Sequence, residues 1–158
     1  MNSLHVEIPM PVAAISKNGS HGTWHKQQEL FQQAKTDAYN CIVNVRNNSP
    51  CQLPWTGPVV VLVRWYARSR PFPDFDNMVA RLAPAMDAAQ AANLFGNDNQ
   101  IVGQVLIHAG LSKEPRVALT FGFMTVDTWN AFMAPLRAKI EGSVCLGSSQ
   151  IGMATVGH

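Results

Sequence analysis

A run of strand-forming residues in the middle of the chain, Val59 to Arg68 (VVVLVRWYAR), most constrains the fold. Its first half is apolar on both faces, which is typical of a strand covered on both sides. Past Val63 the residues alternate, so that Arg64, Tyr66 and Arg68 share one face. The run therefore predicts the central strand of a sheet, with a cationic face that leads toward Arg70.

The segments around this strand predict the other elements. Leu4 to Ile8 alternates apolar and polar residues before Pro9 and Pro11, which predicts a short strand, and Thr23 to about Arg46 repeats apolar residues at helical spacing. Ile101 to His108 and Arg116 to Phe121 are two further strands, which we expect to form a hairpin beside the central strand. Together they predict one compact α+β domain over residues 1–122, with a mixed sheet of about four strands flanked by helices.

The C-terminal part, residues 123–158, has a different character. The stretch Gly122 to Glu141 contains a helical segment with an apolar side. The residues after it are small and rich in Gly and Ser, so we expect a C-terminal helix followed by a flexible tail.

Acidic residues are scarce in this chain, 10 among 158, but gather after the central strand. Asp74 and Asp76 follow the strand two residues apart, an Ala-rich helix continues to about Ala92, and a turn then presents Asp98. If the chain returns to its starting point, the three carboxylates converge. Hard oxygen ligands of this kind suit Mg²⁺, with Mn²⁺ as a possible substitute, and such metals serve phosphate chemistry.

Each acid also has a plain structural explanation. Asp is favoured where a helix begins, so Asp76 could be an N-cap. Asp98 stands beside Gly96 and Asn97 and could be a turn residue. An EF-hand is excluded, because the loop that would start at Asp74 has Val79 where the motif requires Gly.

The pattern P-D-F-D-N, then M-D-A, then N-D-N-Q-I resembles the signature of the RusA-like family of Holliday junction resolvases. It covers Pro73, Asp74, Asp76, Asn77, Asp87, Ala88, Asp98, Gln100 and Ile101. The resemblance extends weakly over about residues 4 to 122. It implies a homodimeric, Mg²⁺-dependent endonuclease that cuts four-way DNA junctions by paired nicks. Carried onto this chain, the catalytic, metal-binding acids are Asp74, Asp76 and Asp98.

Two positions depart from the family pattern. The family usually has a Lys in the helix, where this chain has Ala80 and Ala83, and Arg81 points away from the helical stripe that those two alanines share. Asn97 replaces the first acid of the family's second pair. The departures bear on turnover more than on binding, so the alternative is a non-catalytic DNA-junction binding protein. A third hypothesis is a structural domain whose acids only cap and turn.

Positively charged residues near the acids are candidates for contacts to DNA phosphates. Arg68 and Arg70 lead directly into the acidic segment, Arg81 lies in the helix, and Lys17 lies in the loop after the first strand. Arginine suits this role because its planar fork can grip two oxygens. The net charge of +2 carries little information, because what matters is where the cations lie.

Composition limits the setting in which the chain works. No apolar run approaches the roughly 20 residues that span a bilayer, and the N-terminus does not resemble a secretory signal. The three cysteines have no paired spacing typical of a zinc site or a disulfide framework. We therefore expect a cytoplasmic protein without a membrane partner.

Overall fold

The computed structural model of the chain describes residues 2–15 and 24–147. The chain divides into two units, Met1–Met124 and Thr125–His158, close to the boundary expected after residue 122. The first unit holds a four-stranded sheet with two helices, and the second holds helix α3 (Val126–Gly147). Each unit is described by itself.

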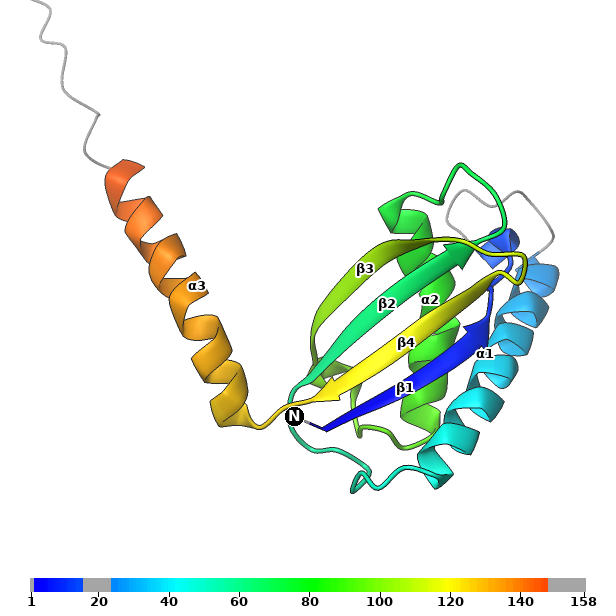
Figure 1. Cartoon of the computed structure of the whole chain (residues 1–158), viewed down its shortest axis with the longest axis horizontal. Helices are drawn as coiled ribbons and strands as arrows, with labels where there is room; N and C mark the ends of the chain where they lie inside the picture. The colour runs from blue at the N-terminus through cyan, green and yellow to red at the C-terminus, as the bar shows by residue number, and fades with distance from the viewer. Residues whose placement is uncertain (1, 16–23, 148–158) are drawn as a thin grey trace, which may run out of the picture. The chain divides into compact units, whose positions relative to one another are not determined.

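The sheet consists of β1 (Asn2–Pro9), β2 (Val59–Ala67), β3 (Ile101–Leu111) and β4 (Arg116–Phe123) in the order β1-β4-β2-β3 (Figure 1). Strand β4 runs antiparallel to both β1 and β2, whereas β3 runs parallel to β2. This mixed sheet with its helices confirms the predicted α+β class.

The predicted hairpin of the last two strands is wrong. Strand β2 lies between β3 and β4, so these two strands flank it and do not pair with each other. The connection between them, residues 112–115, passes the end of β2, where the Ser112 N–H donates to the Ala67 carbonyl at 2.8 Å. A connection as short as this usually joins two paired strands in a hairpin. Here β2, the most apolar strand, lies between β3 and β4, the two strands that the connection joins.

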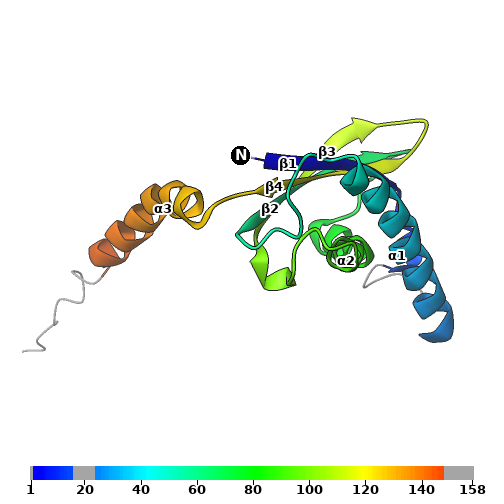
Figure 2. The ribbon, with the colours of Figure 1, turned by 90° about the horizontal axis from the view of Figure 1, so that it is seen from below.

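Helices α1 (Trp24–Asn47) and α2 (Phe75–Ala91) cover one face of the sheet (Figure 2). Helix α1 buries Ala38 and Ile42, and helix α2 buries a stripe at helical spacing that is made largely of small residues. Its members are Met78, Leu82, Pro84, Ala85, Ala88 and Ala89. Two short 3₁₀ turns, η1 (Ala13–Ile15) and η2 (Asp98–Gln100), precede α1 and β3.

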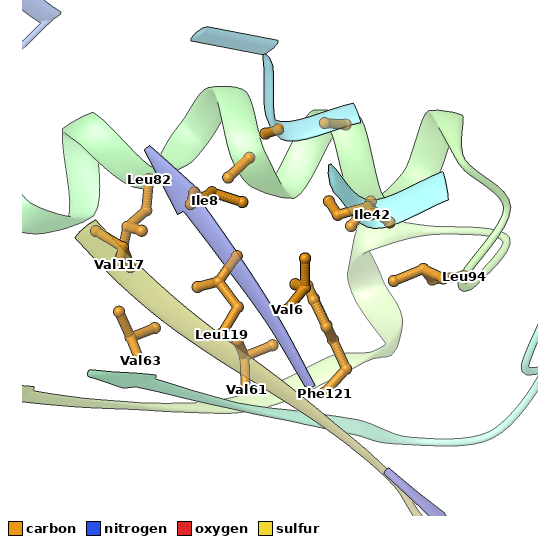
Figure 3. Close-up of a cluster of buried hydrophobic side chains, with 14 of the residues drawn as sticks. Val6, Ile8, Ile42, Val61, Val63, Leu82, Leu94, Val117, Leu119 and Phe121 are labelled. Atoms are coloured by element: carbon orange, nitrogen blue, oxygen red, sulfur yellow. The ribbon is translucent and has the colours of Figure 1, made fainter. Parts of the chain in front are cut away.

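The core lies between this sheet face and the two helices. Figure 3 shows ten labelled side chains that gather there from β1, β2, β4, both helices and the segment after α2. Burial alternates strictly along β2, so Val61 and Val63 are fully buried while its opposite face is half-exposed. The expectation that β2 is covered on both sides is therefore wrong for the described residues. On that open face, Val105 and Ile107 of β3 are 50% and 43% exposed.

The connection from β2 through α2 to β3 determines where the acidic residues lie. Helix α2 has 17 residues and so spans about 25 Å. Because β3 is parallel to β2, the helix must carry the chain back along the full length of the sheet. The start of α2 therefore lies at the C-terminal end of β2, and η2 lies where β3 begins, opposite Val59.

In the second unit, α3 confirms the predicted C-terminal helix. Thr125 stands before it and accepts a hydrogen bond from the Thr128 N–H at 3.2 Å. The rings of Trp129 and Phe132 stack on one side, with centroids 5.9 Å apart. The tail that we expected to be flexible begins at residue 142, but residues 142–147 belong to α3, and residues 148–158 lie outside the described residues. No helix in the described part of the chain is long and apolar enough to cross a membrane.

Candidate functional site

Asp74 occupies the N-cap position of α2. Its backbone is extended (φ −66°, ψ 167°), and its side-chain Oδ1 accepts a hydrogen bond from the Asn77 N–H at 2.9 Å. Asp76 follows in the first helical turn, where a negative charge is favourable. The capping residue is thus Asp74, not Asp76 as the structural alternative supposed. Both side chains are exposed, and Asp76 has no hydrogen-bond or ion-pair partner among the described residues.

Asp98 lies at the other end of α2, as the first residue of η2. The expectation that the chain returns it to Asp74 and Asp76 is wrong within one chain, because a single straight helix separates them by its whole length. Among residues 2–15 and 24–147, no three His, Cys, Asp or Glu side chains form a group that could hold a metal ion. Asp74 and Asp76 still fit Mg²⁺ chemically, as exposed carboxylates with free oxygens.

The residues around Asp98 have clear structural roles. Asn97, which departs from the family pattern, caps η2 through its side-chain oxygen, which accepts from the Asn99 N–H at 2.9 Å. The Gln100 amide oxygen accepts from the N–H groups of Gly96 and Asn97, and its nitrogen donates to the carbonyls of Trp55 and Gly57. The bonds are 2.8 to 3.0 Å long: the two to Trp55 and Gly57 fasten η2 to the loop that precedes β2, and the two from Gly96 and Asn97 close the turn before η2.

An open cleft adjoins the acidic end of α2. It has a volume of about 640 Å³ and contains Asp74, Asn77 and Arg81 from α2 together with Arg68 after β2. Its remaining walls are largely apolar, from the segment after β1 and the proline-rich loop before α2. They are formed by Met10, Pro11, Val12, Ala13, Trp65, Ala67, Ser69, Pro71, Phe72, Pro73 and Pro115. We call this the α2 cleft.

Asn77 and Arg81 line the α2 cleft, and each has one polar atom that is covered from solvent. These atoms, Asn77 Oδ1 and Arg81 Nε, have no hydrogen-bond partner among the described residues. Burial lowers the pKa of the Arg81 guanidinium, and the negative charge of Asp74 partly offsets this effect. Arg81 therefore lies on the Asp74 side of the helix, although it is off the stripe of Ala80 and Ala83.

The other predicted DNA contacts are placed as follows. Arg68 lines the α2 cleft, Arg70 is exposed in the loop between β2 and α2, and Lys17 falls outside the described residues. Neither Arg68 nor Arg70 forms an ion pair among the described residues, whose two side-chain ion pairs are Lys35–Asp87 and Arg116–Glu7. The acidic end of α2 thus has arginines whose charge is not used inside the protein.

Two residues of the predicted motif have roles that the pattern did not reveal. Asp87 pairs with Lys35 of α1 at 3.4 Å, so it ties the two helices together. Asn77 donates its backbone N–H to the Asp74 carboxylate and so completes the N-cap of α2. Outside the motif, His108 stacks on Phe72 with ring centroids 4.5 Å apart and lies 3.1 Å from the Met78 sulfur, so it packs against the loop before α2 and the first turn of the helix.

Comparison with models of protein families gives no match for this chain, and comparison with curated proteins gives none either. The residues and their geometry therefore carry the functional argument.

Proposed function

We propose that this chain is a Mg²⁺-dependent, structure-selective DNA endonuclease that resolves four-way junctions, as its resemblance to the RusA-like family implies. The observation that carries the proposal is the acidic end of α2. There the exposed carboxylates of Asp74 and Asp76 stand beside a cleft lined by Arg68 and Arg81. Carboxylates for a metal next to arginines for phosphate are what phosphodiester hydrolysis requires.

The arginines would position the DNA backbone. Arg70 is exposed and Arg68 lies at the cleft wall, and neither forms an ion pair with an acid of residues 2–15 or 24–147. Free guanidinium groups are available to phosphate oxygens, which are the main source of affinity for DNA. Arg81 is more buried, which lowers the pKa of its guanidinium, and the negative charge of Asp74 partly offsets this effect.

Asp74 and Asp76 would hold the metal together with water. Asp74 Oδ1 accepts from the Asn77 N–H, which fixes the carboxylate and leaves its second oxygen open. When bound, Mg²⁺ would polarise the scissile phosphate and lower the pKa of a coordinated water. Asp74 is the N-cap of α2 and Asp76 is the second residue of the helix, and both side chains are exposed at this end of it.

The third acid requires a second copy of the chain. Within one chain Asp98 lies about 25 Å from Asp74, the length of a 17-residue helix. If all three acids share one metal, Asp98 must come from the other copy of a homodimer. This arrangement also provides the two active sites that paired nicks in opposed strands need.

A labelled synthetic four-way junction and a matching linear duplex, incubated with Mg²⁺, Mn²⁺ or EDTA, test the proposal. We expect paired, metal-dependent nicks in the junction alone. Asp74→Asn should abolish the nicks and keep junction binding, because Asn is also a good N-cap and preserves the helix. Asp127→Asn, which changes an exposed acid in the first turn of α3, is the matched control and should nick normally.

Mixed dimers test whether the site is shared between two copies. Asp74→Asn and Asp98→Asn should each be inactive alone. In a co-expressed mixture, a mixed dimer keeps one site with all its acids, so activity should return to about a quarter of the wild-type sites, as single nicks. If each chain built its own site, every site would carry a mutation and no activity would return.

The alternative is a junction-binding protein without efficient cleavage, and the lack of a Lys at Ala80 and Ala83 favours it. Junction binding without nicks under any metal would support this alternative. The absence of any junction binding would exclude both, and would leave the acids with structural roles only, Asp74 as the cap of α2 and Asp98 as the first residue of η2.

A further inference from the structure

The two edge strands of the sheet differ in how they are protected. Strands β1 and β3 lie at the edges, and among the described residues each pairs on one side only (Figure 1). An edge strand exposes backbone N–H and C=O groups that can pair with another chain, so proteins usually shield edges with charged residues, prolines or short strands. Strand β1 has 8 residues, includes Glu7 and ends at Pro9, whereas β3 has 11 residues without a charge or a proline. Strand β3 is therefore the edge that is open to pairing.

Exposed aliphatic side chains lie along this open edge. Val105 and Ile107 are 50% and 43% exposed, on the face of the sheet that the helices do not cover. Between Gly103 and His108, the register of β3 against β2 has no irregularity. The middle of β3 thus offers a regular, uncharged edge with apolar side chains, which is the kind of edge that associates with another strand.

A groove on the helix side of the sheet adjoins the same edge. It has a volume of about 430 Å³ and lies between residues 101–104 of β3 and one flank of α2. The α2 wall is mainly apolar and includes Val79, Leu82, Ala83 and Met86. The edge and the groove form one surface, which a partner that brings both a strand and a helix would cover.

Strand β3 is complementary to itself in the antiparallel direction. Full overlap of residues 101–111 in two copies places Leu106 opposite itself, on a two-fold axis. Val105 then lies opposite Ile107 of the partner subunit, and this aliphatic pair occurs twice. On the other face, Gln104 lies opposite the partner's His108, which can exchange a hydrogen bond with it. Because β3 carries no charge, two identical strands meet without repulsion.

We propose that β3 pairs in the antiparallel direction with β3 of a second copy of this chain, so that the two sheets join into one. A two-fold axis perpendicular to the joined sheet keeps the helices of both copies on one face and sets the two α2 helices antiparallel, with their groove walls between them. A standard interface takes about 20–30 residues a side. The 11 residues of β3 and the α2 wall of the groove approach this size.

One consequence of this pairing rests on the proposed function. Leu111 lies opposite Ala67, at the end of β2 that leads to Asp74. Antiparallel pairing places the partner's Ile101 beside Leu111, so the partner's Asp98, three residues earlier, would arrive at the end of the sheet where α2 begins. The second copy would thus supply the third acid of the proposed metal site.

Sedimentation velocity of the full-length protein over a range of concentrations tests the pairing. Val105→Lys combined with Ile107→Lys puts like charges opposite each other in both pairs, so the dissociation constant of the dimer should rise about tenfold. Val105→Lys combined with Ile107→Glu puts opposite charges in the same pairs and should restore most of the affinity. Val126→Lys changes a 58% exposed side chain of α3 and is the control, which should leave the affinity unchanged.

Three outcomes would overturn the proposal. The first is a monomer at every concentration, and the second is a dimer whose affinity is the same in all variants. The third is equal weakening in both double variants of β3, because charges of opposite sign must attract if Val105 meets the partner's Ile107. Urea unfolding verifies that the variants stay folded, as the exposure of both side chains leads us to expect.

Cross-linking gives a second test that adds no charge to the strand. Opposed residues of an antiparallel pair have Cα atoms about 4.5–5.5 Å apart, within the range of a disulfide. Oxidation of a mixture of Val105→Cys and Ile107→Cys proteins should therefore link one to the other, whereas Val105→Cys alone should link far less. Mass spectrometry identifies the linked peptides. The absence of a link between positions 105 and 107 would contradict the pairing.

The outcome is separable from that of the proposed function. Junction nicking by a protein that does not pair through β3 would keep the endonuclease and remove this interface. Pairing through β3 without junction binding or nicking would keep the interface and remove the resolvase assignment. If both proposals hold, the double lysine variant should lose nicking at low protein concentration, and the variant with Ile107→Glu should recover it.

Discussion

The two ends of helix α2 both carry acidic and amide side chains, but they use them in opposite ways. At the C-terminal end, Gln100 fills all its hydrogen-bonding capacity within the protein, and Asn97 caps the turn. At the N-terminal end, the buried polar atoms of Asn77 and Arg81 have no partner, although they lie beside a cleft. The hydrogen bonds at the first end hold two segments together, whereas the second end has two buried polar atoms without a partner among the described residues.

This difference shows how to tell residues that stabilise the fold from residues that bind a ligand when both ends carry the same residue types. An amide whose donors and acceptors all form hydrogen bonds within the protein holds two segments together, so removing it should lower the free energy of unfolding. A buried amide or guanidinium with unmet valences lowers stability, and its function must lie in binding. The variants below test this contrast by their sign as well as their size.

Gln100→Leu should give the largest loss of stability. It removes four hydrogen bonds and leaves the carbonyls of Trp55 and Gly57 without their partner, for a loss of about 3 kcal/mol in the free energy of unfolding. Urea unfolding followed by circular dichroism measures it. The control is Gln90→Leu, which removes a single exposed bond of 3.3 Å to Gly96 and should cost far less. Equal losses would show that the four bonds do not fasten this end.

Gly57→Ala tests the same end through packing. A Cβ atom at position 57 would lie 2.6 Å from the Met124 carbonyl oxygen and 2.9 Å from the Trp55 Nε1, so the Trp55–Met124 hydrogen bond must open. We expect a loss of about 2 kcal/mol, which thermal unfolding would detect. Gly103→Ala is the matched control, because its nearest neighbour would be Val60 at 3.9 Å, an ordinary contact. If Gly57→Ala unfolds at the same temperature as the unchanged protein, the loop before β2 can shift to accommodate the added Cβ atom.

Asp74→Ala should cost about 1 kcal/mol, the usual loss for an N-cap, because the Asn77 N–H loses its acceptor. Asp74→Asn should keep most of this stability. Asp76→Ala should change it by less than about 0.5 kcal/mol, since only a favourable charge near the helix start is removed. The three free energies of unfolding, measured in urea, separate the cap from the neighbouring acid. A larger loss in Asp76→Ala would show that Asp76 is the structural residue.

The elements of this fold were predictable because each has a local pattern. The apolar run at β2 and the helical spacing of α1 and α2 gave elements whose observed limits differ by one or two residues from those expected. The strand order was not predictable in the same way. Nothing in residues 112–115 distinguishes a hairpin turn from a connection that passes over the end of another strand, because the competition between strands for the central position is not local.

The candidate site was predictable only in part for a related reason. The sequence identified Asp74 and Asp76 as neighbours, because two residues this close in the chain are near each other in any fold, although Asp76 lies in the helix and not on an extended segment. The position of Asp98 depended on whether β3 runs parallel to β2, which fixes the helix as a one-way crossing of the sheet. That Asp74 and not Asp76 caps the helix depended on the hydrogen bond from the Asn77 N–H, which only three-dimensional structure reveals.

Arg81→Met should change stability in the opposite direction from the other variants. It replaces a partly buried guanidinium, whose Nε has no partner, with an apolar chain of similar length, so the free energy of unfolding should rise by about 1 kcal/mol. Arg70→Met changes an exposed residue of the loop before α2 and should leave stability unchanged. The same Arg81→Met protein should bind junctions more weakly. A gain in stability together with a loss of binding would show that the Arg81 guanidinium serves binding and not the fold. A loss of stability would mean that the guanidinium forms its interactions inside the protein, and that both ends of α2 serve to stabilise the fold.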